Sequence, residues 1–338
     1  MKGSWFNKRI LALCAVALAL LGLVALLGFF SSRPPPPTPL PNPNGYDDFL
    51  QAAASLTGDV GNSSTFDQDM LREFVAANAE PLRLLRLGLT RHCSVPTDEV
   101  MTNFPATINN LARLKQLAWL LADEGRLAEL ESRPADAARS YLNALHFGNE
   151  VSRGGFLINR LVGIACEALG GSPLAALSRK LNCEQVLAVV PELEKLDRWA
   201  VTWDEVEQNE ARFRRYQLRK GFNPITWVMT RWQGWKQRKL GEQRHNRLAA
   251  HLRLLTVELA LHCYQTEHGR GPDRLDQLVP GHLKRVPLDP FSGQPFIYRV
   301  SGTNWLLYSV GADGVDDGGK AAGRSASSQG DLLYDSQW

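Results

Sequence analysis

An unbroken run of 21 apolar or small residues, from Ile10 to Phe30, constrains this chain more than any other feature of its sequence. As an α-helix this run is about 31 Å long, which matches the hydrocarbon core of a bilayer. It is longer than the apolar part of a cleaved signal peptide, and the Gly-Phe-Phe-Ser-Ser at its end is a poor cleavage site. We therefore predict an uncleaved transmembrane anchor that contacts membrane lipid through residues 10–30.

Basic residues on either side of the anchor predict its orientation. Lys2, Lys8 and Arg9 precede the run, whereas only Arg33 follows it closely. Because loops rich in Lys and Arg stay on the cytoplasmic side, the N-terminus is expected in the cytoplasm. We expect a single-pass protein of the cell inner membrane whose bulk is extracytoplasmic, in the periplasm. Seven prolines between residues 34 and 43 predict an extended, semi-rigid spacer next to the anchor.

The remainder of the chain has a mainly α pattern, and its organisation is predicted as four segments. These are the cytoplasmic n-region and anchor (1–30), a Pro-rich linker (31–44), a helical domain (45–240) and a C-terminal α+β module (241–338). The net charge of +3 indicates no particular partner. The five cysteines lack zinc-ligand spacing. The four outside the anchor either form up to two disulfides in an extracytoplasmic body or stay free as buried thiols.

One segment of the helical domain carries a resemblance to a known repeat. Apolar residues recur there at helical spacing, and Gly125, Ala137, Tyr141 and Ala144 stand at the mutual spacing of a tetratricopeptide repeat. The helix pair over about residues 111–147 therefore resembles one such unit. Glu124 departs from the pattern, and no second copy follows. Two interpretations remain open: a helical hairpin within a bundle, or a repeat array.

A basic and aromatic stretch lies at the end of the helical domain. Residues 212–247 hold eleven Lys or Arg, six aromatic residues and one acidic residue, Glu242. Three interpretations are open: the solvated basic face of a long helix, a surface for anionic lipid headgroups, or a site for another acidic partner. Nucleic acid is not expected as a partner, because the predicted topology puts this stretch outside the cytoplasm.

The pattern changes from about Arg244 onward. A helix is predicted up to Gly269, with an apolar stripe made by Leu248, Leu252, Leu255, Leu259 and Cys263. Phe296–Val300 and Trp305–Val310 then predict two strands joined by a Ser-Gly-Thr-Asn turn. A long helix followed by a small antiparallel sheet is an α+β module.

The helix from about Arg244 and the residues after it resemble the C-terminal part of the type II secretion major pseudopilin. The resemblance covers about 90 residues and rests on the order Val286-Pro287-x-Asp289-Pro290, Gly293-x-Pro295-x-x-Tyr298 and Tyr308-Ser309-x-Gly311-Ala312-Asp313-Gly314. It implies a link to secretion. Because the anchor lacks the glutamate that pseudopilins carry in their hydrophobic helix, we expect a tethered protein and not a pseudopilus subunit.

The resemblance also implies a metal site, since the last loop of that family binds calcium. Asp313 matches the family's Ala-Asp-Gly, and Asp331 falls where a later ligand would lie, with Asp316 and Asp317 in the loop between them. Calcium prefers six to eight hard oxygen ligands, which a glycine-rich acidic loop can supply. The other interpretation is an acidic turn without an ion.

The sequence offers no motif for catalysis. Residues 314–321 nearly match a phosphate-binding loop, but Ala321 replaces the required Ser or Thr, and Asp316 and Asp317 would repel phosphate. The seven histidines show no ligand pattern. We expect a protein that is not an enzyme: a membrane-anchored envelope protein, secretion-related or scaffolding, with an unidentified protein partner. The alternative is an extracytoplasmic adaptor whose helices form an uncharged groove for a peptide or protein.

Overall fold

The computed structural model describes residues 39–338, except 59, 62, 221–223, 303, 322, 324–328 and 337. The predicted anchor over residues 10–30 and most of the linker therefore lie outside the described residues. So do many side chains of the basic and aromatic stretch, 212–247.

Most of the described chain is helical. The first helices are α2 (Gly45–Ala54), α3 (Gln68–Ala77), α4 (Ala79–Leu89) and α5 (Thr97–Thr102). Longer helices follow: α6 (Phe104–Leu130), α7 (Pro134–Glu150), α8 (Leu157–Leu177), α9 (Cys183–Arg198), α10 (Trp203–Lys220) and α11 (Pro224–His268). Short 3₁₀ turns lie at Ser63–Thr65, Ser178–Lys180 and Leu275–Leu278. The prediction of a mainly α protein is confirmed.

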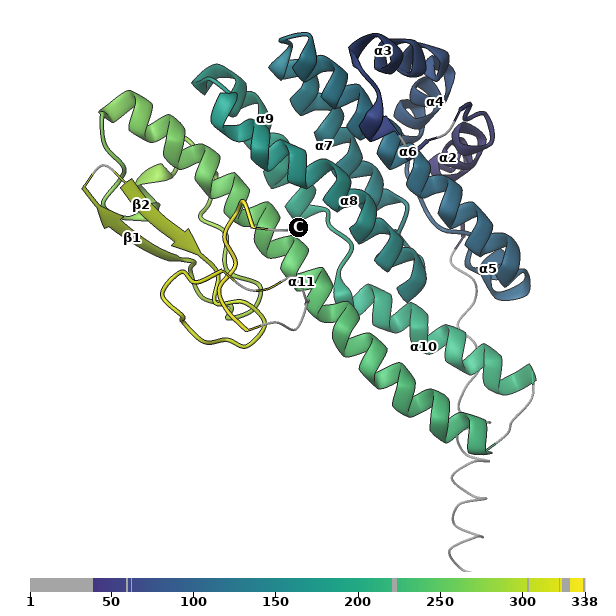
Figure 1. Ribbon diagram of the computed structural model, residues 1–338. Coiled ribbons are helices and arrows are strands. Elements are labelled where there is room, and N and C mark those ends of the chain that lie inside the picture. Colours follow the sequence, from purple (N-terminus) through teal and green to yellow (C-terminus); the bar gives the residue numbers. More distant parts are fainter. Residues whose placement is uncertain are drawn as a thin grey trace, which may run out of the picture.

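The long helices lie side by side across the molecule (Figure 1). α7 packs against α6 and α8, and α11 packs against α8 and α9. Helices α2, α3 and α4 lie at one end of this row, and the C-terminal module lies at the other.

The turn between α6 and α7 follows from local chemistry. Pro134 is the first residue of α7, where the missing N–H costs nothing, and Ser132 turns the chain with φ of 58°. Across this hairpin, a Cβ on Gly125 would lie 2.3 Å from the ring of Tyr141. The Tyr141 hydroxyl donates to Glu129 at 2.7 Å. A glycine is thus required at residue 125 for α6 and α7 to approach.

Helix α8 and the turn that follows it, Leu157–Lys180, form the one described segment that is long and apolar enough to cross a membrane. Half of its apolar window is buried inside the protein, and α8 packs against α6, α7 and α11. It also carries Arg160, 2% exposed, in an ion pair with Glu167. Packing within the bundle therefore accounts for its apolar composition.

The C-terminal module begins inside a helix. α11 starts at Pro224, about 20 residues before the predicted start near Arg244, so the predicted start was wrong. The sequence held a signal for the earlier start, since Ile225, Val228 and Trp232 stand at helical spacing. The predicted end is confirmed, since Gly269 follows α11 with φ of 74°. The proposed boundary between residues 240 and 241 falls within this one continuous helix.

The two predicted strands are confirmed to within two residues at each end. β1 (Ile297–Ser301) pairs antiparallel with β2 (Asn304–Tyr308), with Ile297 opposite Tyr308. The Trp305 indole N–H donates to Glu258 of α11 at 3.0 Å, which fixes the sheet against that helix.

Two clusters of buried apolar residues form the core. The first joins α2 to α8, and in it the rings of Phe49 and Phe147 meet edge to face at 4.9 Å. The second includes Leu174 of α8, Leu255 of α11 and Leu307 of β2. The helical body and the C-terminal module therefore share the second cluster.

The structure also answers what the cysteine spacing left open. Cys183 at the start of α9 is bonded to Cys263 of α11, with Cα atoms 5.2 Å apart. Cys93 and Cys166 are free and buried. Of the four cysteines outside the anchor, one pair therefore forms a disulfide and the other pair stays free as buried thiols.

The contact between α6 and α7 gives a direct test of the fold. We expect Gly125→Ala to lower the free energy of unfolding by about 1–3 kcal/mol, because the new methyl group meets the Tyr141 ring. Gly234→Ala in α11 is the matched control: nothing lies within 4 Å of its Cβ position, so higher helix propensity should stabilise it by up to about 1 kcal/mol. Denaturant unfolding measures both, and equal effects would contradict the described packing.

Candidate functional site in the acidic loop

The acidic loop, residues 311–331, follows β2 and contains every predicted calcium ligand. Its start is fixed by Asp289, a buried residue 2% exposed. One oxygen of Asp289 accepts from Phe291 N at 2.9 Å and from Ser309 Oγ at 3.0 Å, and the other accepts from Val310 N at 3.2 Å. Sequence reasoning used Asp289 only for the resemblance and missed this role, which depends on contacts about 20 residues away.

The two ends of the acidic loop are held together. Ser309 and Leu332 exchange backbone hydrogen bonds of 3.0 and 2.9 Å. Asp313 accepts from Gly330 N at 3.1 Å, so its carboxylate lies next to the end of the loop. Gly311 has φ of 68°, and a Cβ there would lie 2.5 Å from the Gly330 carbonyl oxygen. Only glycine fits this closure.

Asp331 is the most buried of the predicted ligands, with no exposed surface. Its Oδ2 accepts from Gly319 N at 2.7 Å, whereas its Oδ1 is buried without a hydrogen-bond partner. Burial raises the pKa of this carboxyl group, and the charges of Asp316 and Asp317 act in the same direction. A buried carboxylate oxygen without a partner is costly, and a bound cation would satisfy it.

The other two predicted ligands differ from Asp331. Asp316 accepts from the Tyr308 hydroxyl at 2.7 Å and pairs with Arg299 at 2.7 Å, and these contacts lower the pKa of its carboxyl group. Its oxygens are thus already used to hold the loop against the sheet. Asp317 is half-buried in the same loop.

The fit to calcium is therefore partial. Among the described residues, only Cys183, Cys263 and Glu267 form a group of three ligand atoms within 4.8 Å of one another, so the aspartates of the acidic loop do not converge to that extent. The unpartnered Oδ1 of Asp331 favours a cation, whereas the exposed Asp313 carboxylate already accepts from Val315 N and Gly330 N. These two carboxylates, with backbone carbonyls of the loop, are the oxygens that would hold calcium.

A groove of about 170 Å³ lies between α7 and α9, where the adaptor alternative requires one. Its lining is not uncharged, since Arg139, Glu150, Glu192 and Lys195 contribute to it. Most of these charges are already in ion pairs: Lys195 with Glu192 at 3.5 Å, and Arg139 with Asp136 at 3.2 Å.

His251 and His262 of α11 each lie against a tryptophan of the C-terminal module. The His251 ring stacks on Trp338 with centroids 5.2 Å apart, and the His262 ring meets Trp305 edge-on at 5.2 Å. His262 also lies 3.3 Å from Glu258. These contacts give both residues a packing role.

Comparison with known proteins adds no assignment to this geometry. No family model, no curated protein and no solved structure matches the chain. The resemblances to a pseudopilin and to a tetratricopeptide repeat remain predictions from the sequence. The case for function therefore rests on the contacts described above.

Calcium should stabilise the protein through Asp331. We expect calcium to raise the Tm of the full chain in detergent, and Asp331→Asn to abolish this response. Because the pKa of Asp331 is raised on folding, the free energy of unfolding of the chelated protein falls as pH rises from the ordinary carboxyl pKa to the raised value. An amide does not titrate, so Asp331→Asn does not lose this stability as the pH rises. In chelator at pH 7 the variant should therefore have a higher Tm than the wild type.

Asp276→Asn is the control for this measurement, because Asp276 is an exposed carboxylate of the same module, paired with Arg274. It should keep the calcium response. A wild-type Tm that is equal with calcium and with chelator would rule out the calcium site.

Proposed function

We propose that this protein is a non-catalytic scaffold of the cell envelope, anchored in the inner membrane by residues 10–30, with its helical body and C-terminal module in the periplasm. The disulfide between Cys183 and Cys263 carries this proposal. Disulfides persist in oxidising compartments such as the bacterial periplasm and are rare in the cytosol. The basic residues before the anchor support the same orientation.

The way the body and the module are joined supports a scaffold. Besides the shared core and the disulfide, Arg253 of α11 pairs with Asp197 of α9 at 2.7 Å and donates to the Leu288 carbonyl at 2.9 Å. Arg179 pairs with Asp335 at 2.7 Å, which ties the 3₁₀ turn after α8 to the C-terminal end of the described chain. Links of this kind hold a surface in a fixed shape for a partner.

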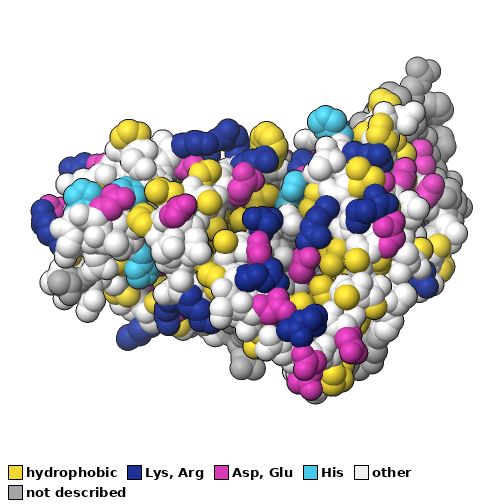
Figure 2. Space-filling model, turned by 90° about the horizontal axis from the view of Figure 1, so that it is seen from above, with side chains coloured by type: hydrophobic (Ala, Val, Ile, Leu, Met, Phe, Trp, Pro, Cys, Tyr) yellow, Lys and Arg dark blue, Asp and Glu magenta, His cyan; other side chains and the backbone are white. Residues whose placement is uncertain are grey.

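The described grooves support a protein partner over a small-molecule substrate. The groove between α7 and α9 measures about 170 Å³, and a second, beside Arg253 and Lys284, about 90 Å³. Sites for small ligands are usually about 300–1,000 Å³. On the face shown in Figure 2, acidic and basic side chains are intermixed with small apolar patches. The pseudopilin resemblance favours a component of a secretion assembly as the partner.

The adaptor is the second candidate, and one observation favours it. Trp199 beside the groove between α7 and α9 is 57% exposed, and the ammonium group of Lys195 lies 5.4 Å from its ring centre. Tryptophan is enriched among the residues that anchor a peptide or protein partner, and an exposed one beside a groove can serve as such an anchor. This alternative predicts that Trp199→Ala weakens partner binding without changing the fold.

The location can be tested by counting thiols. After denaturation in maleimide-polyethylene glycol, the membrane-bound full chain should react at three cysteines, since two of the five are in the disulfide. Prior reduction should expose all five. A chain without residues 1–30 lacks Cys14 and should stay in the cytosol, with four reactive cysteines before and after reduction. Five reactive cysteines in the unreduced full chain would contradict the periplasmic location.

The scaffold role can be tested on the same membranes. Cross-linking of the full chain in detergent should recover components of a secretion assembly, and recovery should be unchanged by Gly234→Ala, which touches no neighbour. A full chain that sediments as a monomer, with no cross-linked product, would contradict a scaffold role.

A further inference from the structure

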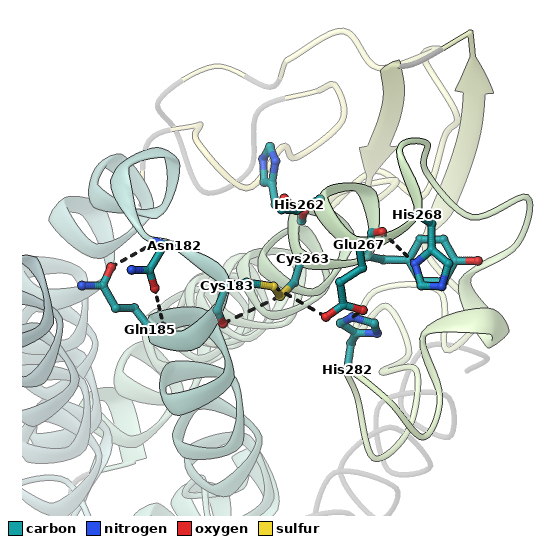
Figure 3. The surroundings of a disulfide bond; sticks show 10 residues. Asn182, Cys183, Gln185, His262, Cys263, Glu267, His268 and His282 are labelled. Atoms are coloured by element: carbon teal, nitrogen blue, oxygen red, sulfur yellow. Dashed lines mark hydrogen bonds and ion pairs between the residues drawn. A yellow bond between two sulfur atoms is a disulfide. The ribbon is translucent and has the colours of Figure 1, made fainter.

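A second group of ligating side chains lies around the disulfide, away from the acidic loop. The two sulfur atoms of Cys183 and Cys263 and a carboxylate oxygen of Glu267 all lie within 4.8 Å of one another. Figure 3 shows the Glu267 carboxylate between the disulfide and His282. One oxygen of Glu267 is 3.9 Å from Cys183 Sγ, and the other is 3.0 Å from Nε2 of His282.

Each of these residues is held in place by its own element. Cys183 is the first residue of α9, whose N-cap Asn182 accepts from Gln185 N at 2.9 Å. Glu267 is one turn after Cys263 on α11, so both project from the same face. The His282 side chain is 8% exposed, and its backbone N–H donates to the Leu278 carbonyl at 2.8 Å.

We propose that this group is a zinc site that the disulfide closes: when Cys183 and Cys263 are reduced, their sulfurs, Glu267 and His282 bind one Zn²⁺. Two thiolates, a carboxylate and an imidazole are a donor set that suits this ion in tetrahedral coordination. The structure brings the first three donors within 4.8 Å of one another, and His282, whose Nε2 now bonds to Glu267, completes the set when its ring turns to the ion. The inference rests on the described side chains and not on the proposed partner, and in the proposed periplasmic location the zinc-bound state forms only where a dithiol reductant reaches the disulfide.

The spacing of the two cysteines allows both states. Their Cα atoms are 5.2 Å apart. In a tetrahedral site with Zn–S bonds of about 2.3 Å the two sulfurs are about 3.8 Å apart, which rotation about the Cα–Cβ bonds can reach. The position of Cys183 at the N-terminus of α9 favours its thiolate, because the helix dipole stabilises negative charge there. Glu267 is 46% exposed, so an ion can enter from solvent.

The disulfide state and the zinc-bound state interconvert by thiol–disulfide exchange followed by metal binding. A dithiol reductant gives two electrons and two protons to the Cys183–Cys263 bond, which breaks to give two thiols, while the reductant becomes a disulfide. Each thiol then loses its proton as its sulfur binds Zn²⁺, so two protons are released for each ion. A disulfide oxidant reverses the exchange: it takes two electrons from the two thiolates and two protons from water and becomes a dithiol, while the Cys183–Cys263 bond re-forms and the ion is released.

The remaining cysteines outside the anchor do not compete for the ion. Cys93 and Cys166 are both buried and belong to the other hydrophobic cluster. Burial raises the pKa of the Cys93 thiol to about 12 and that of the Cys166 thiol further, so neither forms a thiolate readily.

Cobalt and zinc titrations of the full chain in detergent test the site. After reduction by dithiothreitol and its removal without oxygen, Co²⁺ should bind at one ion per chain, with the thiolate charge-transfer and d–d absorption bands of a tetrahedral site. Zn²⁺ should displace it, and Cys93→Ala with Cys166→Ala should not change the titration. Binding of the same kind by the oxidised chain would overturn the proposal.

Variants of Glu267 and His282 keep both cysteines. They therefore distinguish a zinc site with four ligands from metal binding by two free thiols alone. Glu267→Gln and His282→Gln should each weaken Zn²⁺ binding at least ~10-fold. His268→Gln is the matched control, because His268 lies nearby on α11 but bonds to the Tyr264 carbonyl at 2.9 Å, and it should bind Zn²⁺ as the wild type does. Unchanged affinity in both ligand variants would overturn the proposal, with far-ultraviolet circular dichroism confirming that each variant is folded.

Discussion

The described structure depends on the burial of one helix segment, residues 248–263 of α11. Leu248, Leu252 and Leu259 form the stripe that sequence periodicity reveals, but Leu254 and Leu261 on the other side are buried as completely. A helix with apolar residues on two opposite sides is stable in water only when other elements cover both sides. α8 and α9 cover one side of α11, and the C-terminal module covers another.

The buried segment of α11 is also the element to which the sheet and α9 are joined by polar and covalent links. A two-stranded hairpin is marginal by itself, so it needs a packing partner, which α11 supplies. The Trp305–Glu258 hydrogen bond and the Cys183–Cys263 disulfide then fix the sheet and α9 to that helix. The disulfide closes a separation of 80 residues, and cross-links of this length typically stabilise by about 2–4 kcal/mol.

The two candidate ion sites differ in how they are built. The acidic loop is closed by glycines and by backbone hydrogen bonds, and its candidate ligands are hard oxygens of Asp313 and Asp331, which suit calcium. The group around Cys183 combines sulfur, carboxylate and imidazole from helices and a turn, which suits zinc in the reduced state. We expect an ion in the first to stabilise the module, and an ion in the second to bind only when the disulfide is reduced.

The sequence by itself determined the features that depend on neighbouring residues. Helical periodicity, Pro134 at the start of α7, Gly269 at the end of α11 and the two strands follow from local propensity and turn chemistry. Only the tertiary structure decided that Cys183 pairs with Cys263, that Asp331 is buried while Asp316 is paired with Arg299, and that α11 is covered on both sides. These outcomes depend on contacts between residues far apart in the chain, which spacing and composition do not encode.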